Sequence, residues 1–427
     1  MKENKKKISS PFNKDIPFFF STYYEKKNPL FLSSSEKEIL PILYKNLKKA
    51  HQKLKKISKN DSYKLQLLKI DTDILLNNIP YLDTPNIKIP FYAPRALKAK
   101  FLYQKALFEI YQTDLLNASN HLSKALKIFK RKKYYFECGE CFLAFAKVYK
   151  ICGNLDISRA MLYEAENIFL NYIKVKPKLA EIKAYHGLNE LMYENYENAI
   201  KYFECASKIC QKNNYNITYS NILNWKALAL FKLNQLDTSK SLLNTALEIP
   251  KISPYTKAFS YDLLARIYKS KNKLKSALKY IELGLSIAKK LKNEQDLFEL
   301  NYLKAEVLFL KKDNTNSKAI LTQLIEKKSS PKAPYFKANA YTLLGIISLN
   351  ENNLKRAQNL FKLALDLENS KSRELGLAID YNNIAEVFIR QKDITSANKY
   401  LNLALENAIA TDNKPLIEFL ENKLNKI

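Results

Sequence analysis

The sequence contains few of the residues that interrupt helices or cross-link chains. Among its 427 residues there are 6 glycines, 3 histidines, 1 tryptophan and 5 cysteines. So few glycines argue against a fold rich in tight turns or loops, where glycine is the default residue. An odd number of cysteines in a chain of this size indicates reduced thiols rather than a disulfide framework. We therefore expect a helical protein in a reducing compartment, the cytoplasm.

Long apolar runs are missing as well. No segment approaches the roughly 18 consecutive apolar residues that a membrane-spanning helix needs. The N-terminus is basic like that of a signal peptide, but its apolar core extends only from Ile16 to Phe20, contains Pro17 and precedes no small-residue cleavage site. We predict no transmembrane segment and no cleaved leader, which again favours a cytoplasmic location.

Sequence motifs of catalysis are also missing. No glycine-rich phosphate loop, nucleophile elbow or His-x-x-x-His pair occurs, and the three histidines are far apart. Cys138 and Cys141 have the spacing of a zinc or redox pair, although structural zinc needs about four ligands and no second pair follows. Alternatively, both cysteines are small buried side chains, and His186 is likewise expected in the core. We predict a protein that is not an enzyme and binds no metal or cofactor.

What the sequence has instead is an amphipathic pattern, which is clearest in residues 341–367. A first helix carries Tyr341, Leu344, Gly345 and Ser348 on one face. A second helix carries Leu354, Ala357, Phe361 and Ala364 on one face. The turn between them contains Asn352, a residue type that tolerates a left-handed backbone at a helix end.

The pattern recurs at a nearly constant interval. One position of the second helix is always small, and its copies are Ala118, Ser158, Ala199, Ser239, Ala277, Ser317, Ala357 and Ala397. The successive intervals are 40, 41, 40, 38, 40, 40 and 40 residues. Helix pairs repeated in this way stack on their neighbours, because one pair alone cannot bury its apolar face.

This arrangement resembles the tetratricopeptide repeat. Its interval exceeds the 34 residues of the common form and is similar to that of kinesin light chain and of Rap-type regulators. The resemblance implies an all-α fold, a right-handed superhelical solenoid of helix–turn–helix repeats with a C-terminal capping helix. It is specific for the fold but not for the function, because such repeats serve many unrelated partners.

Composition divides the chain further. We predict an extended, aromatic-rich N-terminal arm over 1–34 and a helical hairpin over 35–78. Four prolines favour an extended linker over 79–97. About eight repeats are expected over 98–408, followed by the capping helix over 409–427, because solenoids need their open ends covered.

The resemblance also implies a binding surface, since tetratricopeptide arrays bind ligands along the concave face made by their first helices. Transferred to this sequence, that face contains Asn221, Asn224, Asp262, Arg266, Tyr302, Glu306, Asn382, Glu386 and Arg390. Asparagine amides on it could hydrogen-bond a peptide backbone. The alternative is a solvated surface with local ion pairs such as Asp262–Arg266.

A net charge of +29 raises a second hypothesis. Near the N-terminus an apolar helical stripe lies opposite a row of lysines that includes Lys48, Lys49, Lys53 and Lys56. Such a helix could bind an anionic membrane surface or nucleic acid, or its lysines could simply be solvated. Lysine greatly outnumbers arginine, whereas base recognition favours arginine. The sequence therefore predicts a non-enzymatic scaffold that binds a protein or peptide, with lysine-mediated binding of nucleic acid or membrane as the alternative.

Overall fold

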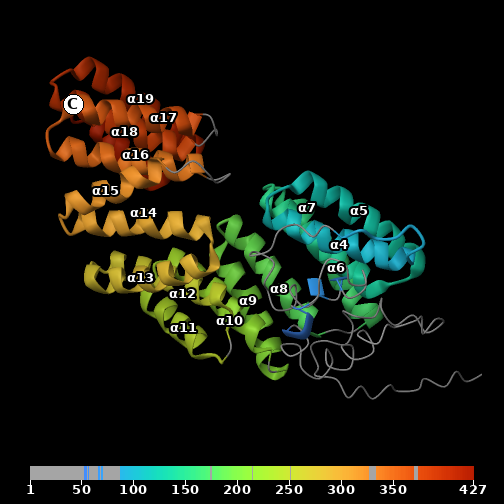
Figure 1. Ribbon diagram of the computed structural model, residues 1–427. Helices are drawn as coiled ribbons and strands as arrows, with labels where there is room; N and C mark the ends of the chain where they lie inside the picture. The colour runs from blue at the N-terminus through green and yellow to red at the C-terminus, as the bar shows by residue number, and fades with distance from the viewer. Residues whose placement is uncertain are drawn as a thin grey trace, which may run out of the picture. The chain divides into compact units, whose positions relative to one another are not determined.

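The computed structural model describes residues 52–54, 56, 66–67, 69–70, 87–173, 176–213, 215–250, 252–326, 333–369 and 374–427. Within these ranges the regular secondary structure is entirely helical (Figure 1). The chain divides into two compact units, unit 1 up to Thr256 and unit 2 from Lys257. The predicted all-α fold class is therefore confirmed.

The described part of unit 1 from residue 87 onward contains four helix pairs in chain order. They are α4 (Arg95–Tyr111) with α5 (Leu115–Lys132), α6 (Tyr135–Ile151) with α7 (Leu155–Ile168), α8 (Lys176–Met192) with α9 (Tyr196–Asn213), and α10 (Asn216–Lys232) with α11 (Leu236–Glu248). A π-helical turn, Phe169–Ile173, continues α7. The first helices α4 and α6 contact each other, as do α8 and α10.

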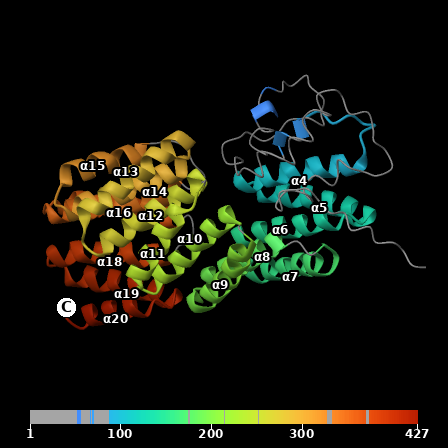
Figure 2. The same ribbon diagram turned by 90° about the horizontal axis from the view of Figure 1, so that it is seen from below.

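Unit 2 repeats the same plan and ends with a single helix (Figure 2). Its helices are α12 (Pro254–Ser270) with α13 (Leu274–Leu291), α14 (Glu294–Leu310) with α15 (Asn314–Glu326), α16 (Ala333–Asn350) with α17 (Leu354–Asn369), α18 (Glu374–Arg390) with α19 (Ile394–Ala410), and α20 (Lys414–Leu424). The first turn of α12 lies before the unit boundary. Here too the first helices of successive pairs are in contact, α14 with α16 and α16 with α18.

The small residues that define the repeat lie where the two helices of a pair meet. All eight second-helix positions from Ala118 to Ala397 are at most 1% exposed. Where the residue is serine, its hydroxyl donates to a carbonyl of the first helix: Ser158 to Ala146 at 2.9 Å, Ser239 to Ala227 at 2.7 Å and Ser317 to Ala305 at 2.8 Å. The serines therefore keep the close approach and still satisfy their buried hydroxyls.

One glycine shows why the approach must be close. A Cβ atom at Gly345 would lie 2.7 Å from Cδ1 of Phe361, whose ring is fully buried. The ring occupies the space that a side chain on α16 would need. Gly187 and Phe203 have the same relation, with a would-be contact of 2.6 Å.

The turns within the pairs share one geometry. In each turn the second residue after the first helix has a left-handed backbone; these residues are Thr113, Gly153, Glu194, Asn234, Asn272, Lys312, Asn352 and Lys392. The prediction for Asn352 is thus confirmed, with φ of 59°. The N–H of Asn353 then donates to the carbonyl of Ser348 at 2.9 Å, which closes a Schellman motif. The side chain of Asn353 also accepts from the N–H of Arg356 at 3.2 Å, so one residue ends α16 and caps α17.

Thr113 is the costly member of this series, because a β-branched residue is strained at its φ of 62°. We expect Thr113→Gly to stabilise unit 1 by about 1 kcal/mol, the left-handed penalty reduced by the entropy of a more flexible unfolded chain. Urea unfolding followed by the fluorescence of Trp225, which lies in unit 1, measures this change. The matched control is Gly153→Thr. Nothing lies within 4 Å of a Cβ at this position, so the backbone conformation alone determines the change in stability. Its effect should have the opposite sign, and two effects of equal sign would contradict the explanation.

Several predicted segments lie wholly or largely outside the described residues. They are the arm over 1–34, most of the hairpin over 35–78, and Lys48 and Lys49 of the basic helix. Lys53 is helical and Lys56 is exposed. Helix α4 begins at Arg95, inside the range assigned to the proline-rich linker, and α19 extends to Ala410 before α20 begins.

Candidate functional site

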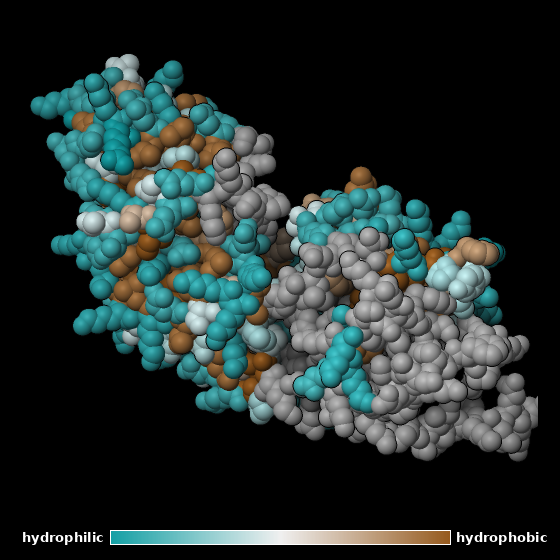
Figure 3. Space-filling view, viewed as in Figure 1, coloured by the Kyte–Doolittle hydropathy of each residue, from teal (hydrophilic) through white to brown (hydrophobic). Residues whose placement is uncertain are grey.

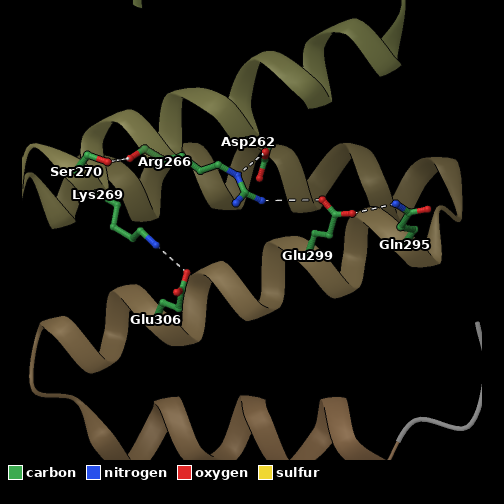
Figure 4. A network of polar contacts seen from close by, with 7 residues as sticks. All are labelled: Asp262, Arg266, Lys269, Ser270, Gln295, Glu299 and Glu306. Atoms are coloured by element: carbon green, nitrogen blue, oxygen red, sulfur yellow. Dashed lines mark hydrogen bonds and ion pairs between the residues drawn. The ribbon is translucent and has the colours of Figure 1, made fainter. Parts of the chain in front are cut away.

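The predicted binding residues of unit 2 form two groups of polar contacts between neighbouring first helices. In the group on α12 and α14, Arg266 Nε donates to Asp262 Oδ2 at 2.8 Å, and Arg266 Nη2 lies 3.9 Å from Glu299 Oε2 (Figure 4). Lys269 Nζ donates to Glu306 Oε2 at 2.8 Å. The structure thus brings Asp262, Arg266 and Glu306 together and adds two residues that the sequence analysis did not select. Residues 33 to 37 apart meet because each repeat places its first helix beside the next.

This first group carries an excess of acidic residues. Four carboxylates, those of Asp262, Asp296, Glu299 and Glu306, stand against the two cations of Arg266 and Lys269. Burial, with Glu299 and Asp262 adding to it, raises the pKa of Asp296 to about 6. The side chains of the ion pairs are 25% to 36% exposed, so a ligand can reach them. Their charge favours a cationic group on that ligand.

The second group joins α18 to α20. Lys423 Nζ donates to Asn382 Oδ1 at 3.0 Å and to Glu386 Oε2 at 2.9 Å. Arg390 Nη1 donates to the carbonyl of Leu349 at 2.8 Å. Although burial alone would raise the pKa of Glu386, Lys423 and Arg390 together lower it. The predicted residues Asn382, Glu386 and Arg390 therefore lie in one group of contacts. A lysine of the final helix, which the sequence did not indicate, completes the group.

The remaining predicted residues make hydrogen bonds or packing contacts within the protein, which leaves them less available to a ligand. Asn221 Oδ1 accepts from the hydroxyl of Thr256 at 2.6 Å. Asn224 is 2% exposed and donates to the carbonyl of Thr256 at 2.9 Å, so a ligand would have to compete with that bond. Tyr302 is partly buried and packs against the core of α14 and α15 at Phe298 and Leu324.

A charged group in unit 1 was missed altogether. Tyr103 on α4 donates to Glu140 on α6 at 3.2 Å, and Lys178 on α8 lies 2.8 Å from the same carboxylate. Lys178 also contacts Glu181 at 3.0 Å, and Glu181 contacts Lys147 at 3.3 Å. The only local signal was the Lys178–Glu181 spacing of three residues, because the other partners come from two other helices, α4 and α6.

The paired cysteines are structural. Cys138 and Cys141 are 3% and 0% exposed, which confirms the interpretation as small buried side chains. Burial raises the pKa of Cys138 to about 11 and that of Cys141 well above its usual range, so both thiols stay protonated and unreactive at neutral pH. Across the described residues, no group of three or more His, Cys, Asp or Glu side chains is placed to hold a metal ion. Cys152 and Cys205 are exposed.

His186 is also a core residue, as predicted. Its side chain is 2% exposed and lies between Tyr202, stacked at 5.3 Å between ring centroids, and Tyr163 at 5.0 Å. Burial lowers its pKa to about 4, with Lys183 and Arg159 adding to the effect and Glu166 opposing it. The imidazole is therefore neutral at physiological pH.

The face of unit 2 seen in Figure 3 presents mainly polar side chains to a partner. Figure 3 shows that polar side chains cover most of unit 2 on this face, with apolar ones scattered among them. Exposed apolar residues include Leu310 and Leu363. None of the described helices combines the length and apolar character needed to cross a membrane.

Comparison with known proteins shows which repeat family this helix pattern resembles. The profile of the tetratricopeptide repeat family matches residues 260–291, which hold the C-terminal part of α12 and all of α13. These residues are a tetratricopeptide repeat. The chain has no significant match among curated protein sequences.

Solved structures match most of this chain. The apo form of the quorum sensor NprR from B. thuringiensis aligns over 88% of this chain and 99% of its own, with 15% identity and a TM-score of 0.60. The apo form of RapI aligns over 88% and 98%, with 15% identity and a TM-score of 0.54. A Rap protein complexed with Competence and Sporulation Factor aligns over 87% and 92%, with 14% identity and a TM-score of 0.50. At these identities the likeness establishes the fold, a helical-repeat solenoid.

Proposed function

We propose that this chain is a non-enzymatic scaffold that binds a protein or peptide along the first helices of its repeats. The observation that carries the proposal is the set of partly exposed polar contacts between successive first helices, seen on α12 and α14 and again on α18 and α20. Such rows of donors and acceptors suit an extended peptide, whose backbone offers both at regular intervals.

The structural neighbours support this proposal. NprR is described as a quorum sensor, and the Rap protein was solved with Competence and Sporulation Factor. Proteins of this fold thus include one with a bound factor. The comparisons give no support to the alternative of lysine-mediated binding to nucleic acid or membrane.

In unit 2 the acidic excess on α12 and α14 favours a partner that presents a lysine, an arginine or a free N-terminal amine there. Arg266 keeps the carboxylates of Asp262 and Glu299 oriented, and these carboxylates would receive the cation. A cation of the partner would replace ion pairs of Arg266 by ion pairs with the partner. Salt screens such exposed charges, so binding should weaken as the salt concentration rises.

Site-specific photo-crosslinking in native lysate tests the proposal. A benzoylphenylalanine at Gln295, which hydrogen-bonds Glu299 at 2.9 Å, places the crosslinker at the edge of the acidic group. The matched control carries it at Leu363, an exposed position on the second helix α17. We expect a discrete protein adduct from position 295 that survives nuclease and is several-fold weaker from position 363. An adduct that nuclease removes, or equal adducts from both positions, would contradict the proposal.

A further inference from the structure

The charged group on α6 and α8 of unit 1 contains a lysine that pairs with no carboxylate of the described residues. Its carboxylates, Glu140 and Glu181, are both engaged by Lys178, at 2.8 Å and 3.0 Å, and Glu181 is also engaged by Lys147 at 3.3 Å. Lys150 lies one helical turn after Lys147 on α6. No ion pair of the described residues includes Lys150.

Both lysines of α6 face one aromatic ring. Lys147 Nζ lies 4.9 Å and Lys150 Nζ 5.5 Å from the ring centroid of Tyr185 on α8. Lys150 is partly exposed, as a residue that a ligand is to reach must be. The ring holds it through a cation–π contact, which is weaker than an ion pair with a carboxylate. Of the described residues, three lysines and two glutamates meet here, which leaves one surplus positive charge among them.

The protonation states fix where that surplus lies. Burial opposes the ionisation of Glu181, but Lys178 and Lys147 outweigh it and lower its pKa to about 2. For Lys147, burial is likewise outweighed, by Tyr185, Glu181 and Tyr111, and its pKa is raised. Burial and the neighbouring Lys147 lower the pKa of Lys150 to about 8, as expected for a cation with no partner.

Two phenols complete the surroundings. Tyr185 on α8 and Tyr111 at the end of α4 both lie within electrostatic range of Lys147. Burial raises the pKa of each hydroxyl, so both stay protonated and can donate a hydrogen bond. The charged and titratable groups around Lys147 and Lys150 therefore come from α4, α6 and α8. A monoanion at Lys150 would find its ammonium group and the Tyr185 hydroxyl, with the Tyr111 hydroxyl near Lys147.

We propose that Lys150, with Lys147, Tyr111 and Tyr185, binds a carboxylate of an acidic peptide segment. The inference rests on the proposed function, because it names the chemistry of one contact with a peptide partner. A surplus of a single charge suits one carboxylate better than a phosphate dianion or the closely spaced anions of a nucleic-acid backbone, because Glu140 and Glu181 would repel every further negative charge.

Fluorescence polarisation on the full chain tests this inference. The probe is a fluorescein-labelled peptide with both ends blocked and three glutamates alternating with alanines, and its partner probe has glutamine in place of glutamate. We expect the glutamate peptide to bind, and Lys150→Met to weaken it about tenfold or more. Lys150→Arg should retain binding, because it keeps the positive charge. Lys124→Met is the matched control, an exposed lysine on α5, and should leave binding unchanged.

The pH dependence separates a direct contact from a structural role. A group with a pKa of about 8 is mostly protonated at pH 7 and mostly neutral at pH 9, so the affinity of the wild type should fall about tenfold over that range. Lys150→Arg should show no such fall, since the guanidinium stays charged. Circular dichroism confirms that each variant is folded.

Three results would overturn the inference: equal binding of the glutamine probe, undiminished binding by folded Lys150→Met, or displacement of the probe by inorganic phosphate or an oligonucleotide at lower concentration than by acetate. If the crosslinked partner at position 295 is found but the glutamate peptide does not bind, this inference fails and the proposed function stands. If neither is found, both fail.

Discussion

Replacement of Phe361 by alanine should lower the free energy of unfolding of unit 2 by about 4 kcal/mol, the range for removing a buried aromatic ring. The Phe361 ring is 0% exposed and belongs to a core cluster that includes Ile384 and Val387 of α18. It therefore joins one repeat to the next as well as α17 to α16. Loss of the ring leaves a cavity where two pairs meet.

Gly345 makes this prediction sharper. In the wild type, Gly345→Ala should cost about 1–3 kcal/mol, because its Cβ would overlap the Phe361 ring. In the Phe361→Ala background the same change should be neutral or stabilising, since alanine is about 1 kcal/mol better than glycine inside a helix. The sign of the glycine substitution thus reverses with the presence of the ring.

Urea unfolding with two probes measures both effects. Far-UV circular dichroism follows all helices, whereas the single tryptophan, Trp225, reports on unit 1. Phe361→Ala should shift the dichroism transition to lower urea. Costs of Gly345→Ala that are equal in both backgrounds would show that the ring does not determine the need for glycine.

Acidification should destabilise unit 1 through His186. An unfolded histidine has a pKa near 6.5, whereas burial holds His186 at about 4. Between these values the unfolded state binds a proton that the folded state does not, so the free energy of unfolding falls as the pH falls. From pH 7 to pH 4.5 this one residue should remove about 2–3 kcal/mol.

The His186→Phe variant isolates that contribution. Phenylalanine keeps the aromatic packing against Tyr163 and Tyr202 but cannot be protonated. Urea unfolding at the two pH values, followed by Trp225 fluorescence, should show a smaller loss for the variant than for the wild type. Parallel losses in the two proteins would assign the acid sensitivity to other groups.

The repeat could be predicted from the sequence because its constraints are local or periodic. A position that must stay small, such as Ala357, recurs at every interval, and a left-handed turn at Asn352 follows from the residue type. The burial of Cys138 and His186 followed from their places in that pattern.

The site was harder to predict because its contacts join residues from different repeats. Lys423 reaches Asn382 and Glu386 only once α20 has packed beside α18. The overall charge of the chain gave no hint that Lys150 pairs with none of the described carboxylates, since that depends on which neighbours Lys147 engages. Periodicity locates the first helices, but the choice of partners along them depends on side-chain geometry.

The shared turns have a mechanical consequence. Because Asn353 both closes α16 and caps α17, the turn of this pair has no spare residue, and we expect the pair to be stiff. We then expect the solenoid to bend between neighbouring pairs rather than within them. The polar contacts from Lys269 to Glu306 and from Lys423 to Glu386 cross these softer joints. A peptide that replaced such contacts would bind and also set the angle between neighbouring pairs, so that occupancy would be converted into curvature.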